Sequence, residues 1–144
     1  MKKIVIILTL LLLPAVALPC SFKEKTDEEK FNSAKAVFHA KIVETKLGNL
    51  KNPDNSKESI ETVEGKFIVK EKFKGEPPVS GYAKDFVFGP GNCSLGLITG
   101  MEYVFYVSDD DFVLLPTGSF GFFNDEGTAV RPKLDKLREL SKKK

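Results

Sequence analysis

The chain contains two cysteines, Cys20 and Cys93, and the fate of this pair constrains the fold more than any other feature. Cys20 stands in "AVALPCSF", residues 15–22, directly after a strongly apolar N-terminus. It could be exposed near a processed terminus, carry a lipid, or form a disulfide with Cys93. The disulfide would close a loop of about 73 residues and tie the N-terminal segment to the middle of the domain.

Residues 1–17 have the pattern of a cleaved signal peptide. Two lysines precede an apolar run over residues 4–13, and "AVA" at 15–17 has the small-x-small pattern of a cleavage site. The run is shorter than the roughly 18 residues that a membrane-spanning helix needs. We therefore expect an exported protein, in the periplasm or outside the cell, with one domain over residues 18–144. A retained N-terminal anchor is the alternative.

Export changes how charge and cysteines are interpreted. The full chain has 22 basic and 20 acidic residues, and because two lysines belong to the signal segment, the mature chain is close to neutral. Nucleic-acid binding depends on neutralising phosphates, so we expect no nucleic-acid partner. Outside the reducing cytosol, two cysteines and no others favour one disulfide. Closing a loop of this length stabilises a domain by roughly 4 kcal/mol.

Alternation of apolar and polar residues predicts a domain built mostly of β-strands. Segments rich in Gly, Asn, Pro and Asp separate the alternating runs and predict long exposed loops. The last two strands are expected to form a hairpin around the acidic turn at 109–111. The expected strands are 35–45, 61–75, 82–89, 101–108 and 112–116, and the expected loops are 46–59, 89–100 and 117–127.

A short helix is predicted on each side of the strands. Residues 23–34 are polar, with Thr26 or Asp27 as N-cap and acidic residues in the first turn. Near the C-terminus, three leucines stand at helical spacing: Leu134, Leu137 and Leu140. Five strands without helices alternating between them predict a small five-stranded antiparallel barrel, OB-like and closed or partly open.

The sequence offers few catalytic side chains. His39, the only histidine, lies in a predicted strand, where we expect it on a polar or half-buried face, and no partner motif supports a Ser/His/Asp arrangement. Cys20, Cys93 and His39 are chemically able to bind zinc but lack the close spacing of a typical site. We expect no catalytic residue, no metal and no cofactor, and hence no enzyme. Three phenylalanines at 120, 122 and 123 are expected to cap a core, with a binding patch as the alternative.

Five stretches occur in a familiar order: "PCSF", "AKAVFHAKIVE", "GKFIVKEKFKGE", "CSLGLITGMEYVFYV" and "LLPTGS". This order resembles the netrin-like domain and, more narrowly, bacterial relatives of the tissue inhibitors of metalloproteinases. The resemblance covers about residues 20 to 120 and rests on where the strand patterns fall relative to the cysteines. It implies an OB-like five-stranded barrel and a disulfide between the first and the central cysteine, here Cys20 and Cys93.

The second disulfide of that family is absent here. It joins the second cysteine of a C-x-C start to a late "T-C" cysteine, and those positions are Phe22 and about Gly118 or Ser119 in this chain. Because both partners are missing together, we expect Phe22 to pack near Phe120 or Phe122. Its apolar burial would then replace the covalent bond, with a contribution of roughly 2–3 kcal/mol.

The resemblance also implies a mechanism that the N-terminus does not favour. The animal inhibitors chelate a protease's zinc through the α-amino group and carbonyl of an N-terminal cysteine. Cleavage after Ala17 would leave Leu18 and Pro19 ahead of Cys20, so the amino group would lie in the wrong place. Pro19 also disfavours cleavage directly before Cys20, which lipid attachment would require.

The sequence therefore predicts a secreted or periplasmic, non-enzymatic domain that binds another protein. A metalloproteinase inhibitor and a lipid-anchored envelope protein are the alternatives. Contact with a membrane is expected only if the signal is retained or Cys20 is lipidated. The segment expected to form a partner-binding edge comprises Leu18, Pro19, Cys20, Ser21 and Phe22.

Overall fold

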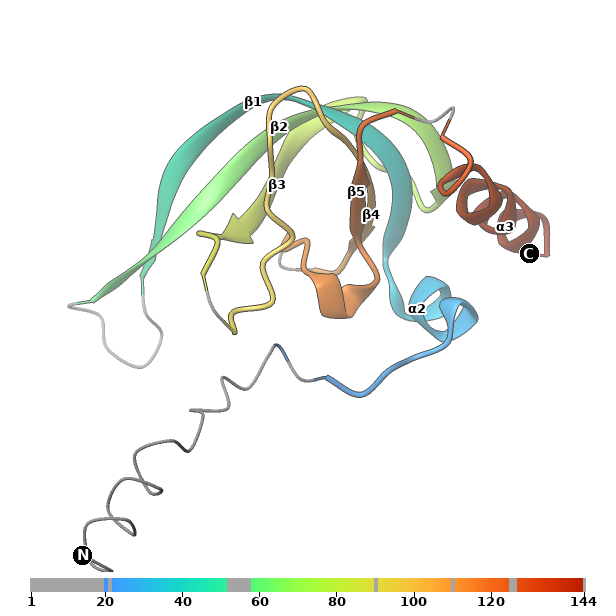
Figure 1. The fold of residues 1–144 in the computed structure, drawn as a ribbon, viewed down its shortest axis with the longest axis horizontal. Helices are drawn as coiled ribbons and strands as arrows, with labels where there is room; N and C mark the ends of the chain where they lie inside the picture. The colour runs from blue at the N-terminus through green and yellow to red at the C-terminus, as the bar shows by residue number, and fades with distance from the viewer. Residues whose placement is uncertain are drawn as a thin grey trace, which may run out of the picture.

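The fold is a curved five-stranded sheet in which two long strands extend beyond the others (Figure 1). The structure is a computed structural model that describes residues 20, 22–51, 58–89, 91–109, 111–124 and 127–143. The predicted signal peptide, with Leu18, Pro19 and Ser21, lies outside these residues.

The sheet has the order β3-β2-β1-β4-β5, and all of its ladders are antiparallel. A helix lies before the first strand and another after the last, so the prediction of a mostly β domain with short flanking helices is confirmed. The elements are α2 (Asp27–Ser33), β1 (Ala36–Lys51), β2 (Ser59–Lys74), β3 (Ser80–Phe86), β4 (Glu102–Val107), the 3-10 helix η1 (Leu115–Thr117), β5 (Phe120–Phe122) and α3 (Arg131–Lys142).

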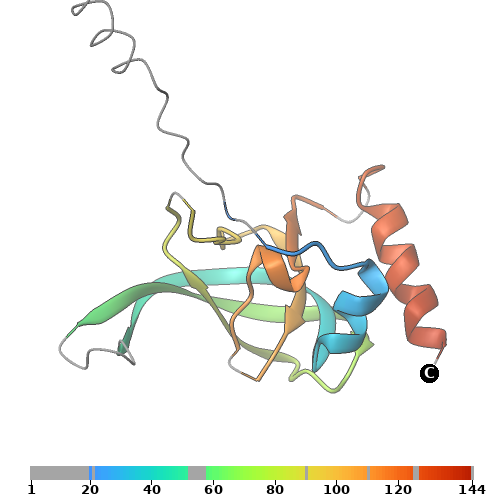
Figure 2. The ribbon, with the colours of Figure 1, turned by 90° about the horizontal axis from the view of Figure 1, so that it is seen from below.

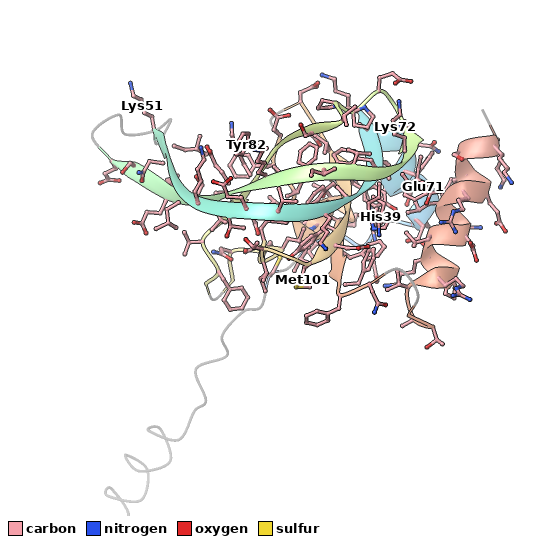
Figure 3. All side chains as sticks on the ribbon, turned by 90° about the horizontal axis from the view of Figure 1, so that it is seen from above. His39, Lys51, Glu71, Lys72, Tyr82 and Met101 are labelled. Carbon is pink, nitrogen blue, oxygen red and sulfur yellow. A yellow bond between two sulfur atoms is a disulfide. The ribbon has the colours of Figure 1, made fainter. Side chains whose placement is uncertain are left out.

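The expected loop at 46–59 is wrong in most of its length, because β1 and β2 continue through it as a two-stranded ribbon. Their pairing runs from Leu47 opposite Val63 to Lys51 opposite Ser59. Some of the facing side chains are polar, as in the 3.1 Å ion pair between Lys46 and Glu64. Apolar pairs lie beside them, with Leu50 opposite Ile60. Such cross-strand pairs stabilise a ribbon that is largely solvated. Lys51 marks the far end of the ribbon in Figure 3.

The fifth strand is also not where the sequence placed it. Residues 112–116 make only isolated bridges, Lys84 to Phe112 and Ser94 to Leu114, and then enter η1. Pro116 lacks the N–H that a continuing ladder needs. β5 instead forms at Phe120–Phe122, inside the segment expected to be an aromatic loop.

The sheet curves but does not close, so the predicted barrel fits only loosely. Where an OB-like barrel would close, β3 meets the segment 111–113 through two backbone hydrogen bonds. The Lys84 N–H donates to Asp111 O at 3.1 Å, and the Val113 N–H donates to Lys84 O at 2.9 Å. The strands form an arch over an interior filled by the inner core, which comprises Phe38, Ala40, Ile42, Phe67, Ala83, Leu97, Tyr103, Phe105 and Val113.

The opposite face of the sheet is covered at one end by α2 and α3 (Figure 2). The predicted α3 is confirmed, and its three leucines are buried there. The helix-side core comprises Phe31, Ala34, Val37, Phe73, Val104, Tyr106, Phe122, Leu134, Leu137 and Leu140.

Charged side chains from β2 fix both helices. Lys74 donates to three carbonyl oxygens at the C-terminal end of α2, those of Phe31, Asn32 and Ala34. These carbonyls have no partner within the helix, so the lysine satisfies them. Arg138 of α3 forms a two-pronged ion pair with Glu71, at 2.8 and 2.7 Å.

Candidate binding surface

The predicted disulfide is present. Cys20 and Cys93 are bonded, with their Cα atoms 5.1 Å apart. The bond holds residue 20 against the long connection between β3 and β4, which we call the Cys93 loop (residues 87–101). A disulfide-bonded sulfur is not a thiolate ligand, so the structure does not support a zinc site made with both cysteines.

Phe22 does not replace a second disulfide by burial, and that expectation is wrong. The residue is 44 % exposed and belongs to neither core. Of the predicted partner-binding edge, the structure describes Cys20 and Phe22 only. Cys20 is bonded to the Cys93 loop, so we describe the surface that this loop forms.

A buried carboxylate anchors the Cys93 loop. Asp85, at the end of β3, is fully buried and accepts hydrogen bonds from Ser94 Oγ at 2.9 Å and from the Gly96 N–H at 2.7 Å. Its other oxygen accepts from the Phe86 N–H at 2.9 Å. Burial raises the pKa of Asp85 above its ordinary value, while the hydrogen bonds from Gly96 and Ser94 lower it. The carboxylate thus acts as a fixed acceptor that gives the loop one shape.

The hydroxyl of Tyr103 is a second anchor of the Cys93 loop, at residues 96–98. It donates to Gly96 O at 2.8 Å and accepts from the Ile98 N–H at 2.9 Å. Its burial raises the pKa of this phenol. Glycine is required at 121 because a Cβ there would lie 2.5 Å from the Tyr103 ring. The Cys93 loop is therefore held at three places: the disulfide, Asp85 and Tyr103.

An apolar hollow of about 660 Å³ lies between this loop, the ends of β2 and β3, η1 and β5. Large apolar side chains at its rim are open to solvent: Phe88 is 81 % exposed, Ile98 56 % and Leu115 43 %. Further lining residues include Val63, Met101 and Phe120. Met101 lies below the sheet in the view of Figure 3.

His39 lies elsewhere, in a buried polar cluster near α3 (Figure 3). It is 2 % exposed, so its expected place on a polar or half-buried face is wrong. Its Nε2 is 2.8 Å from an oxygen of Glu102, and Lys70 donates to the same carboxylate at 2.9 and 3.0 Å. The Phe122 ring packs against the imidazole, with 5.2 Å between ring centroids.

A histidine beside a carboxylate is the arrangement of a general base, but a base must reach its substrate. Here both partners are closed off from solvent, and Lys70 already binds the carboxylate. The cluster places charges of opposite sign in contact, as buried charges require. The buried Glu102 carboxylate therefore has both Lys70 and His39 as partners.

The described residues include no group of three or more His, Cys, Asp or Glu side chains arranged to hold a metal ion. The helices in this part of the chain are too short or too polar to cross a bilayer. The sequence matches none of the protein-family models, and a search of curated proteins returns no significant match. The resemblance to netrin-like domains and metalloproteinase inhibitors stays a prediction.

Sequence reasoning located the disulfide but missed the hollow. Phe88, Ile98 and Leu115 were assigned to loops or a strand without a role. A signal was available in "VFGPGN", because large apolar residues within a Gly- and Pro-rich turn have no strand or helix of their own to pack on.

Proposed function

We propose that this protein is an exported, non-enzymatic domain that binds another protein through the apolar hollow beside the Cys20–Cys93 bond. The exposed apolar rim of Phe88, Ile98 and Leu115 carries the proposal. Scattered single apolar residues are normal on a protein surface, whereas a contiguous group around a concavity marks an interaction site.

The rigidity of the walls supports the same function. Binding costs less free energy when the site does not have to be ordered first. The disulfide, the buried Asp85 carboxylate and the Tyr103 hydroxyl hold the wall in place. A surface exposed only as a by-product of folding would not need three such anchors.

Export is part of the proposal, and it rests on the signal-like N-terminus and on the disulfide, which is typical of oxidising compartments. A disulfide-bonded Cys20 has no thiol left to carry a lipid. Intact mass of the exported protein tests both points. We expect a chain that begins at Leu18 and takes up no alkylating reagent before reduction, and two alkylated thiols before reduction would contradict the proposal.

Site-specific photo-crosslinking in cells that produce the protein tests the binding surface. We would introduce a photo-reactive phenylalanine analogue at position 88 and, as a matched control, at position 82. Tyr82 is also an exposed aromatic residue, at 45 % against 81 % for Phe88. Its side chain lies on the face of β3 opposite that of the buried Ala83, outside the apolar hollow. Protein adducts from position 88 that are absent from position 82 would support the surface. Equal adducts, or none from position 88, would contradict it.

A further inference from the structure

A second, smaller hollow of about 230 Å³ adjoins the apolar one. The two hollows share Leu115 and Phe120 in their linings, so they are direct neighbours. The smaller hollow is lined by Lys30 from α2 and by Lys133 and Lys136 from α3. Apolar and basic surfaces therefore meet at these two shared residues.

Among the described residues, the lysines of this hollow have few acidic partners. No described carboxylate forms an ion pair with Lys30 or Lys133, and Lys136 has only an exposed contact of 3.8 Å to Glu139. Asp27 is the one acidic residue in the lining, and it lies near the Tyr106 hydroxyl, whose pKa burial and this carboxylate raise to about 12. The smaller hollow therefore has a net positive charge.

Two of the lysines are held in position. The Lys133 ammonium lies over the Phe120 ring, 4.9 Å from its centroid, and so stands at the junction of the two hollows. The methylene chain of Lys30 packs on Gly118, where a Cβ would come within 3.0 Å of Lys30 Cδ. Gly118 also has a φ of 107°, which side-chain-bearing residues rarely adopt. The charges are thus placed by packing, at the end of the apolar hollow.

We propose that the two hollows form one composite site for an acidic peptide segment of the partner. A large apolar side chain occupies the larger hollow, and adjacent Asp or Glu carboxylates face the lysines of the smaller one: Lys30, Lys133 and Lys136. This inference rests on the proposed function and specifies its ligand. Charge complementarity favours an anion here, and the neighbouring apolar hollow favours a peptide that carries both groups.

Selection from a library of short random peptides tests the composite site. The target is the exported, disulfide-bonded protein, and affinities of the selected peptides are measured by fluorescence anisotropy. We expect the selected sequences to combine an aromatic or aliphatic residue with a nearby Asp or Glu. In the double variant Lys133→Gln/Lys136→Gln, they should bind about fivefold more weakly, as expected for the loss of two exposed ion pairs.

The matched control is Lys142→Gln/Lys143→Gln, which removes the same charge at the end of the same helix, outside the hollow. It should leave affinity unchanged. Peptides whose Asp or Glu is replaced by Asn or Gln should bind the wild type weakly and be insensitive to the Lys133/Lys136 change. Equal weakening by both double variants would overturn the composite site, because it would show a non-specific charge effect.

Failure of this inference can be told apart from failure of the proposed function. If selected peptides lack acids but lose binding in a Phe88→Ser variant, the composite site is wrong and the apolar binding surface stands. If peptides bind Phe88→Ser as well as wild type, both are wrong.

Vesicles of phosphatidylcholine and phosphatidylglycerol test whether the lysines bind a membrane surface instead of a peptide. Binding to them that requires Lys133 and Lys136, with no peptide selected, would overturn the inference in favour of a membrane surface.

Discussion

The two sides of the sheet are completed in different ways. Under α3, Leu134 and Leu137 are buried against Val104 and Phe122 in the helix-side core. Beside the Cys93 loop, the comparably large Phe88 and Ile98 remain exposed. The chain supplies a helix for one apolar surface, whereas no described element covers the other.

The means of stabilisation differ in the same way. The helix side is held by apolar packing, with Arg138 and Lys74 as polar supplements. The hollow side is held by one covalent bond and by polar anchors, and Leu97 of its loop packs into the inner core. Phe88 and Ile98 are exposed, so they contribute little burial to the fold. This contrast teaches that the hollow is shaped by groups beneath it and leaves its apolar groups available.

The largest effect is expected from removing the disulfide. The double variant Cys20→Ser/Cys93→Ser should lose about 4 kcal/mol of unfolding free energy, because the bond closes a loop of 73 residues. Urea denaturation with and without reductant measures this. Wild type in reductant should match the variant. A loss of less than about 1 kcal/mol would show that the polar anchors alone hold the Cys93 loop.

On the helix side, shortening one buried leucine should lower the unfolding free energy. Leu134→Ala should cost about 3 kcal/mol, because Leu134 is fully buried between α3 and the sheet. Lys136→Ala, on the exposed face of the same helix, is the control and should change stability by less than about 0.5 kcal/mol. Thermal and urea unfolding measure both. Equal effects would mean that α3 is not packed as described.

On the hollow side, Asp85→Asn should cost about 2 kcal/mol near pH 4, because an amide has one acceptor oxygen and cannot accept from both the Gly96 and the Phe86 N–H. The cost should depend on pH. Burial raises the pKa of Asp85 above its ordinary 3.8, so its stabilising contribution is full below that value and is lost as pH rises through the raised pKa. The stability difference between wild type and variant should therefore narrow as pH rises.

Urea unfolding between pH 3.5 and 7 measures whether the stability difference between wild type and Asp85→Asn narrows as pH rises. Asp109→Asn is the matched control, since Asp109 is exposed and pairs only with an exposed Lys35 among the described residues. It should leave the unfolding free energy nearly unchanged over the same range. A difference for Asp85 that widens with pH would show that the hydrogen bonds to the carboxylate outweigh its burial.

Local sequence signals were enough for much of the fold. Thr26 and Glu29 form the capping box that starts α2, and the spacing of Leu134 and Leu137 predicted α3 correctly. Alternation located most of β1, β2 and β4. The β1–β2 ribbon was missed because its pairing depends on the opposite strand, and a polar, glycine-containing segment has no such signal of its own.

The candidate site was less predictable because it depends on distant segments. The disulfide could be inferred because the chain has two cysteines and its N-terminus predicts export to an oxidising compartment. The hollow needs β2, the Cys93 loop, η1 and β5 together, and β5 itself is a three-residue strand that exists only beside β4. The burial of His39 likewise follows from Phe122 and Glu102, which lie more than 60 residues away in sequence.

The smallest effect on stability is expected where the effect on binding is largest. Phe88→Ser should change the unfolding free energy by less than about 0.5 kcal/mol, because the side chain is 81 % exposed. The same variant should lose binding of the selected peptides. Urea unfolding and fluorescence anisotropy on one preparation measure the two quantities together.

A clear loss of stability would mean that Phe88 already packs on its own chain. Unchanged stability with unchanged binding would mean that the exposed apolar rim has no partner. Only the separation of the two effects supports a surface that the fold holds open for another molecule.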